Sequence, residues 1–144
     1  FNTTQHNKGD TLMLYFAYGA NTNIDGMEYR CPNATKVGRL TLPDWKLVFK
    51  HVADIEMHKD EQVHGVLWNI TDECESSLDR FEGFPHLYRK EYFVVRMQDG
   101  SIEDVMFYKM NSGEYARPSQ TYFDTIKQGY ISNQLPLQYL YNCR

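Results

Sequence analysis

The sequence lacks the features that identify membrane-spanning and nucleic-acid-binding proteins. No apolar run approaches the roughly 20 residues that a membrane-spanning helix needs. The 15 Lys and Arg residues form no cluster and are outnumbered by 19 Asp and Glu residues, so the formal net charge is −4. Because nucleic acids and anionic membranes attract proteins through positive charge, we expect neither as a partner.

Sequence signatures of nucleophilic and metal-dependent chemistry are also missing. There is no Gly-x-Ser-x-Gly segment, no catalytic Cys–His signature and no Cys-x-x-Cys pair. His51, His58 and His64 lie near Glu56 and Asp60, but their spacing fits neither two ligands on one helix face nor a zinc finger. We therefore expect these residues to be solvated parts of a hairpin, and we expect no metal site.

Cysteine is scarce, and Cys31, Cys74 and Cys143 show no spacing that is typical of a metal site. Three cysteines cannot all pair within one chain, so one disulfide with one free thiol and three reduced thiols both remain open. Cys74 falls on the apolar stripe of a helix predicted between Thr71 and Gly83. We expect it to pack there as a small hydrophobic side chain.

Three Asn-x-Ser/Thr sequons suggest a location for the protein. They begin at Asn2, Asn33 and Asn69, and the chain begins at Phe1, not at Met. Sequons are acceptors for N-linked glycans in secreted proteins, and Asn33 and Asn69 are expected in a loop and in a strand-to-helix turn. This pattern favours a secreted glycoprotein, with a cytoplasmic protein as the alternative.

The residues that are present suffice for one globular domain. The chain has 144 residues, of which 42% are hydrophobic and 24% charged, and no repeat or linker divides it. Alternating apolar residues predict strands over 12–18, 37–42, 45–49, 52–57, 63–70, 88–97 and 102–110. Helical spacing and capping residues predict helices over 24–30, 72–82 and 118–129, a turn at 58–61, a final turn from 135 and an arm over 1–10. These elements indicate an α+β fold with a small mixed, barrel-like sheet and two or three flanking helices.

The stretch 14–21, with the sequence Leu-Tyr-Phe-Ala-Tyr-Gly-Ala-Asn, is predicted to be a central strand followed by a polar turn. Nearly every residue before Gly19 is apolar or aromatic, so both faces of the strand should be covered. Gly19 allows a positive φ and a close approach to the backbone, and Asn21 tolerates left-handed geometry. Several N–H groups of such a turn can point into one concavity and bind a phosphate or carboxylate. The alternative is an ordinary tight turn.

Glu82 occupies an unfavourable position at the end of a predicted helix. The helix dipole presents partial negative charge there, which opposes a carboxylate. Phe81, Phe84 and Pro85 are expected to crowd the side chain, and the loss of water should raise its pKa further. A carboxyl group with a raised pKa is a candidate general acid/base. The alternative is an exposed glutamate without a catalytic role.

Taken together, these stretches resemble the γ-glutamylcyclotransferase family. Residues 15–21 resemble its glycine loop, and residues 65–68, Gly-Val-Leu-Trp, resemble a core strand. The segment Leu-Asp-x-x-Glu-Gly at 78–83, with Tyr88, resembles its catalytic segment, and the segments 118–122 and 135–139 resemble its C-terminal region. The chain departs from the family at Ala20, where Ser is usual, in the compact Phe84-Pro85-His86 segment, and in its early end after Tyr139.

The resemblance implies that an L-γ-glutamyl amino acid is converted into 5-oxoproline and a free amino acid, without a cofactor. The turn 18–21 would bind the α-carboxylate of the substrate, and Glu82 would carry the proton from the attacking amine to the leaving nitrogen. The implied substrate-binding residues are Tyr15, Phe16, Ala17, Tyr18, Gly19, Ala20, Asn21, Tyr88 and Tyr122.

Two alternatives to this function remain open at the level of sequence. The first alternative is a catalytically weak or inactive secreted binding protein of the same fold. The second is a cyclotransferase that acts on γ-glutamyl amines. The loops 84–88 and 111–117 would decide the choice of leaving group. We expect a small-molecule γ-glutamyl substrate as the ligand and a monomer or homodimer as the assembly.

Overall fold

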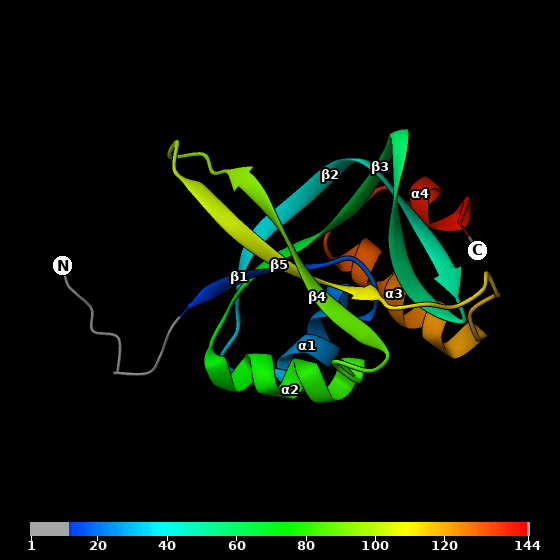
Figure 1. Cartoon of the computed structure of the whole chain (residues 1–144), viewed down its shortest axis with the longest axis horizontal. Helices are drawn as coiled ribbons and strands as arrows, with labels where there is room; N and C mark the ends of the chain where they lie inside the picture. The colour runs from blue at the N-terminus through cyan, green and yellow to red at the C-terminus, as the bar shows by residue number, and fades with distance from the viewer. Residues whose placement is uncertain (1–11, 144) are drawn as a thin grey trace.

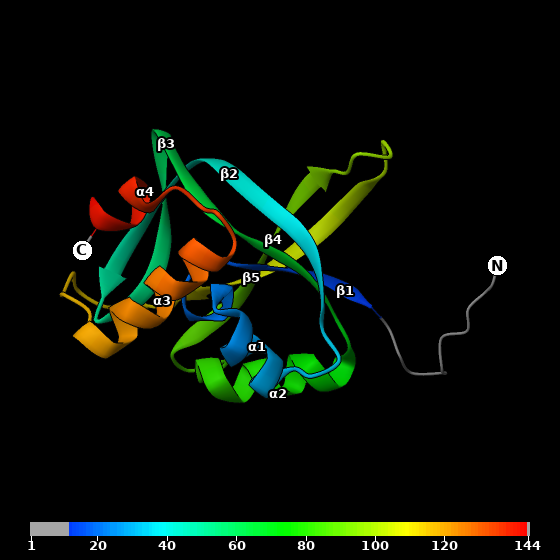
Figure 2. The same cartoon turned by 180° about the vertical axis from the view of Figure 1, so that it is seen from behind.

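The computed structural model describes residues 12–143, which form a five-stranded mixed sheet with helices packed on both faces (Figures 1 and 2). The strands are β1 (Met13–Ala17), β2 (Thr35–Lys50), β3 (Val52–Ile70), β4 (Tyr88–Arg96) and β5 (Ile102–Met110). The helices are the 3-10 turn η1 (Ala20–Thr22), α1 (Ile24–Arg30), α2 (Asp72–Glu82), α3 (Gln120–Ser132) and α4 (Leu137–Tyr141). The strand order is β2-β3-β1-β5-β4, with β1 parallel to β5 and the other neighbours antiparallel.

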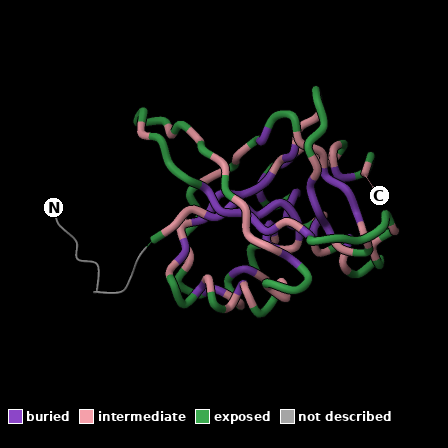
Figure 3. Tube along the Cα trace, in the orientation of Figure 1, coloured by how far each residue is buried: buried purple, intermediate pink, exposed green. Residues whose placement is uncertain are grey.

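Strand β1 lies at the centre of the sheet and contributes to two hydrophobic cores. Tyr15 and Ala17 pack with side chains of α1 and α2, whereas Phe16 and Tyr18 pack with side chains of α3 and α4. This division follows from the alternation of side chains along a strand. Figure 3 shows the buried stretches concentrated where the central strands cross, and the exposed ones at the hairpin tips. The prediction of a strand covered on both faces is therefore confirmed.

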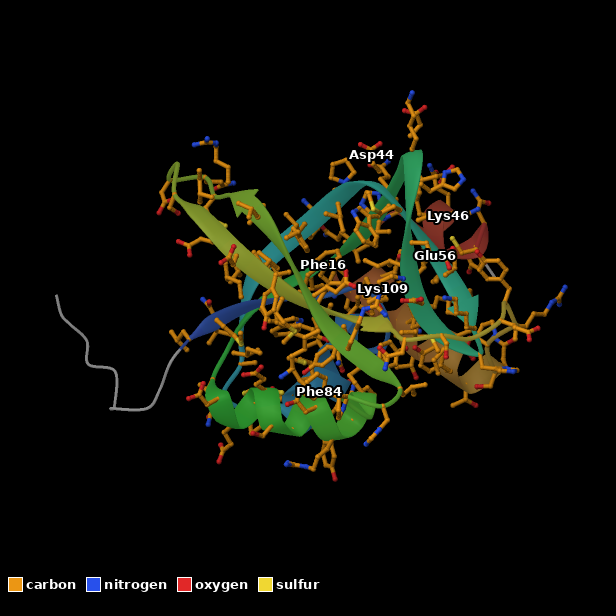
Figure 4. The ribbon with its side chains drawn as sticks, viewed as in Figure 1. Phe16, Asp44, Lys46, Glu56, Phe84 and Lys109 are labelled. Atoms are coloured by element: carbon orange, nitrogen blue, oxygen red, sulfur yellow. The ribbon has the colours of Figure 1, made fainter. Side chains whose placement is uncertain are left out.

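The hairpin of β2 and β3 differs from the sequence prediction, which divided each strand in two. Asp44, with φ 65°, and Asp60, with φ 68°, form a bulge at which the register shifts, and the main-chain N–H of Asp60 donates to Asp44 Oδ1 at 3.0 Å. The polar segment 58–61 is part of the continuous strand β3 and not a separate turn, but it pairs with no residue of β2, because the register passes from Pro43 and Gln62 directly to Trp45 and Met57. Figure 4 shows Asp44 at the bend of the hairpin.

Helices α2 and α3 begin after the capping residues that the sequence indicates, but α3 continues past Gly129, its predicted end, to Ser132. The Thr71 side chain accepts from the N–H of Cys74 at the start of α2, and Gly83 ends this helix with φ 69°. Ser119 caps α3 in the same way. The sequence predicted two or three helices, whereas the structure has four α-helices within residues 12–143, because the expected final turn forms the short helix α4.

The three cysteines are free thiols. Cys31 and Cys74 are buried in the same core, with Cys31 Sγ 3.5 Å from the carbonyl oxygen of Cys74, while Cys143 packs against the other core. The prediction that Cys74 is a core residue is confirmed. The predicted arm over residues 1–10 lies outside the described part of the chain. Within residues 12–143, no helix has the length and apolar composition needed to cross a membrane.

Candidate active site

The turn after β1 and the C-terminal end of α2 meet at one cavity of about 100 Å³. All predicted site residues except Phe16 and Ala17 line this cavity. Its lining residues are Tyr15, Tyr18, Gly19, Ala20, Asn21, Val52, Ala53, Phe81, Glu82, Leu87, Tyr88, Tyr108 and Tyr122.

Phe16 and Ala17 do not reach the cavity. Phe16 has an exposed fraction of 0% and packs in the core with α3, and Figure 4 shows it among the side chains that the sheet encloses. Ala17 is buried in the core with α1 and α2. The assignment of these two residues to the substrate site is therefore corrected. They belong to the family-like segment 15–21, but the alternation of β1 directs both side chains into the cores.

A glycine is needed at position 19 because the main chain there lies close to Ala53, and not because its φ is positive. Its dihedral angles are φ −122° and ψ −123°, so the expected left-handed geometry is absent at this position. A Cβ atom at Gly19 would lie 2.9 Å from Cβ of Ala53 and 3.6 Å from Tyr122 Oη. The missing side chain lets the turn pack directly against the opposite wall of the cavity.

The turn leaves two main-chain donors unused. The N–H of Thr22 donates to Gly19 O at 3.0 Å and that of Asn23 donates to Ala20 O at 3.1 Å, which forms η1. The first N–H groups of a helical turn have no partner within it. Among residues 12–143, the main-chain N–H groups of Ala20 and Asn21 accordingly have no acceptor. Both residues line the cavity, so this turn has the donors that an anion site needs.

Glu82 is partly buried at the cavity and has a perturbed acidity. Burial away from water raises its pKa to about 7, while the positive charge of Arg30 acts in the opposite direction. The predicted direction of the shift is confirmed, but its predicted source is wrong in part. Phe81 lines the cavity with Glu82 as expected, although it is 45% exposed, whereas Phe84 and Pro85 do not line it. The cavity itself provides the low-water environment.

Asn21 connects the turn to Glu82. Its Nδ2 donates to Tyr15 Oη at 3.0 Å and lies 3.5 Å from Glu82 Oε2. Its main-chain oxygen accepts from Nε1 of Trp68 at 3.2 Å. Asn21 is only 2% exposed, so these contacts hold a buried carboxamide against the carboxyl group.

Tyrosines form much of the rest of the cavity wall. Tyr88 Oη donates to the carbonyl oxygen of Ala53 at 2.6 Å, and Tyr122 Oη accepts from the N–H of the same residue at 3.0 Å. Tyr18 Oη donates to Tyr108 O at 2.6 Å. Burial raises the pKa of each of these tyrosines, to about 12 for Tyr122, so all remain neutral near pH 7.

Sequence analysis did not identify Ala53, Tyr108 or Arg30 as part of this site. Tyr108 lies in β5, far from Glu82 in sequence, and its Oη donates to Asp79 Oδ1 at 2.7 Å. Ala53 contributes through its main chain, which leaves no signal in the residue type. In the part of the chain that the structure describes, no group of three or more His, Cys, Asp or Glu side chains is arranged to hold a metal ion.

Comparison with known proteins gives a consistent result. Residues 15–130 match the family described as gamma-glutamyl cyclotransferase, AIG2-like. Gamma-glutamylcyclotransferases of Bos taurus and Homo sapiens are each 32% identical over 139 residues, which cover 88% of this chain and 74% of each relative. A solved structure of a gamma-glutamyl cyclotransferase superposes with a TM-score of 0.80 at 30% identity, covering 92% of this chain and 86% of that one. The α+β fold expected from the sequence is thereby confirmed.

Proposed function

Because this chain belongs to the gamma-glutamyl cyclotransferase, AIG2-like family, we propose that it converts an L-γ-glutamyl amino acid into 5-oxoproline and a free amino acid. One observation carries the proposal for this chain in particular. A carboxyl group with a pKa of about 7, that of Glu82, shares a cavity with the unpaired N–H groups of Ala20 and Asn21. The cavity thus combines a proton carrier for the amine with donors for the substrate carboxylate.

The two parts of the cavity fit the two ends of the reacting glutamyl group. The N–H groups of the turn would bind the α-carboxylate, which fixes the adjacent α-amine. Ala20 lacks the hydroxyl that Ser would supply, but the main-chain donors do not depend on the side chain. Well-oriented intramolecular reactions reach effective molarities of about 10⁵–10⁸ M, so holding the amine against the γ-carbonyl carbon would supply much of the acceleration.

The proton transfers assigned to Glu82 balance the reaction. The neutral α-amine attacks the γ-carbonyl carbon, a new C–N bond closes the five-membered ring, and the carboxylate of Glu82 accepts a proton from the amine. The bond to the leaving nitrogen then breaks, and Glu82 returns the proton to that nitrogen. These reaction steps need no cofactor. We therefore propose a cofactor-independent cleavage of a C–N bond, in which the γ-glutamyl acyl group is transferred to its own amine.

The test is release of 5-oxoproline by the full chain from γ-glutamyl-alanine, glutathione and γ-glutamyl-ε-lysine in parallel. Release from either of the first two substrates supports the proposal. Release from γ-glutamyl-ε-lysine alone would assign the chain to γ-glutamyl amines. Binding of these compounds without any release would leave a non-catalytic binding protein.

We also propose that the protein is exported and carries an N-linked glycan. Asn33 is exposed in the turn between α1 and β2, which is consistent with an accessible sequon. Asn69 is instead within β3, paired with Leu14 and Thr35, and not in the strand-to-helix turn expected from the sequence. Asn2 lies outside the described residues.

The intact mass of protein produced in glycosylating cells tests the export proposal, measured before and after peptide N-glycosidase treatment. We expect the untreated Asn33→Gln variant to be lighter than wild type by the mass of one glycan. An untreated wild-type mass equal to that of the bare chain would favour the cytoplasmic alternative.

A further inference from the structure

Arg30, the last residue of α1, and Glu82 contact different atoms of the Asn21 carboxamide. Arg30 Nε donates to Asn21 Oδ1 at 2.9 Å, and Asn21 Nδ2 in turn lies 3.5 Å from Glu82 Oε2. The three side chains therefore form a line from a guanidinium through a carboxamide to the candidate proton carrier. Sequence reasoning gave no indication of this line, because 61 positions separate Asn21 from Glu82.

The chemistry of Arg30 determines which way the carboxamide of Asn21 faces. A guanidinium has only donors, so the acceptor Oδ1 must face Arg30 and the donor Nδ2 must face Glu82. In the opposite orientation, Nδ2 would meet the guanidinium and Oδ1 would meet the carboxylate of Glu82. Both contacts would be unfavourable in a buried setting, since Asn21 is 2% exposed.

Arg30 is itself held by neighbours on several sides. Its guanidinium carbon lies 3.9 Å from the centroid of the Phe81 ring, a cation–π contact. A Cβ atom at Gly26 would lie 2.7 Å from Nη2 of Arg30, so this glycine leaves room for the guanidinium. The main-chain oxygen of Arg30 accepts from Ser77 Oγ at 2.8 Å, which fixes the end of α1 to α2.

We propose that Arg30 is a positioning residue of the active site, which orients the Asn21 carboxamide toward Glu82 and adds a positive charge beside this pair. This inference rests on the proposed function of Glu82. It adds a residue of α1 that does not line the cavity.

The other ionisable groups around Glu82 do not substitute for Arg30. Five tyrosines share the cavity with Glu82: Tyr15, Tyr18, Tyr88, Tyr108 and Tyr122. Burial raises the pKa of each of them, so they stay neutral as Glu82 titrates. Beyond Ala53, the carboxylate of Asp54 is paired with Lys50 at 2.8 Å and Lys109 at 3.4 Å. Arg30 is thus the charge that lowers the pKa of Glu82 in this site.

Two substitutions separate the donor from the charge. Arg30→Gln keeps a hydrogen-bond donor and removes the charge, whereas Arg30→Lys keeps the charge but loses the planar group that stacks on Phe81. Arg80→Gln is the matched control, because Arg80 is exposed in α2 two residues before Glu82 and removing it changes the net charge equally. Each variant is examined by a pH profile of kcat/KM and by NMR titration of the Glu82 carboxyl carbon.

For Arg30→Gln we expect the midpoint of both curves to rise by about one pH unit, which lowers kcat/KM near pH 6 about tenfold. Arg30→Lys should show a smaller rise, and Arg80→Gln should match the wild type. A folded Arg30→Gln protein that titrates like the wild type would overturn the inference, as would an equal shift in Arg80→Gln. If Arg30→Gln does not fold, a wild-type profile in Arg30→Lys with only reduced stability would assign Arg30 a purely structural role.

This design distinguishes failure of the inference from failure of the proposed function. Absence of turnover in the wild type on every γ-glutamyl substrate would reject the proposed function. The NMR midpoint would still report whether Arg30 controls the ionisation of Glu82, because it requires no substrate.

Discussion

The two walls of the cavity are built on different principles. One wall contains Glu82 and Asn21, with Arg30 bound to Asn21 from outside the cavity, and it includes a group that titrates near pH 7. The opposite wall contains Tyr88 and Tyr122, whose hydroxyl groups bond to the main chain of Ala53 and stay neutral. Only the first wall changes its charge in the physiological range. We infer that the first wall performs the proton transfer and that the second sets the shape of the site.

Glu82→Gln should have the largest effect, because it removes the proton carrier and keeps the shape of the first wall. General acid–base catalysis is typically worth about 10²–10⁴-fold, so kcat should fall by at least this factor. Substrate affinity should change far less, since the donors of the turn are retained. The measurement is 5-oxoproline formation together with substrate binding. Near-normal turnover by a folded Glu82→Gln protein would exclude this residue from the mechanism.

The pH dependence of stability tests the same wall without a substrate. The pKa of Glu82 is about 7 in the folded chain and 4.5 as its ordinary value, so the folded state binds the proton more tightly. The contribution of Glu82 is therefore most favourable below about pH 4.5, and it is lost as the pH rises through 7. Allowing for partial exposure of the side chain, the loss is about 2–3 kcal/mol.

Urea unfolding of wild type and Glu82→Gln at pH 5 and pH 8 measures this loss. We expect the variant to be the more stable protein at pH 8, and its advantage should shrink toward pH 5. A difference that does not vary with pH would show that the carboxyl group is not perturbed.

Gly19→Val tests the contact at which the turn meets the second wall. The new Cβ would lie 2.9 Å from Cβ of Ala53, and overpacking of this kind typically costs about 1–3 kcal/mol. We expect weaker binding of a γ-glutamyl substrate, because the turn must move away from Ala53. Ala20→Ser is the control in the same turn and should bind normally. Full affinity in Gly19→Val would contradict the assignment of the turn as the carboxylate site.

The elements of the fold that could be predicted are those with strong local signals. Thr71 and Gly83 delimit α2, and the apolar run before Gly19 indicates a central strand. The continuity of β2 and β3 could not be predicted, because Asp44 and Asp60 resemble turn residues and only the cross-strand bond between them shows a bulge. Residues 58–61 bulge out of the ladder without partners, and pairing resumes on both sides of them.

The candidate site was predictable to a similar extent. The family-like segments identified Glu82 and the turn after β1, but they also included Phe16, which strand alternation directs into the core. Arg30 and Ala53 could not be found in this way. Arg30 acts through Asn21, and Ala53 through its main chain, so their roles depend on distances between remote segments.

The smallest predicted effect comes from the second wall. Tyr122→Phe removes the hydroxyl that accepts from the N–H of Ala53, so this donor loses its partner. An unpaired buried group costs about 1–3 kcal/mol, and the value here should be near 1 because the cavity can admit water to the N–H. Tyr88→Phe is the companion variant, since it leaves the carbonyl oxygen of Ala53 unpaired.

Both variants should be slightly less stable than the wild type in urea, and both should keep the wild-type pH midpoint of kcat/KM. This retained midpoint distinguishes the two walls, because neither hydroxyl group ionises in the range where Glu82 titrates. If Tyr122→Phe moved the midpoint by as much as Arg30→Gln, the second wall would also control the proton carrier. The division of the cavity into a titrating wall and a neutral wall would then be wrong.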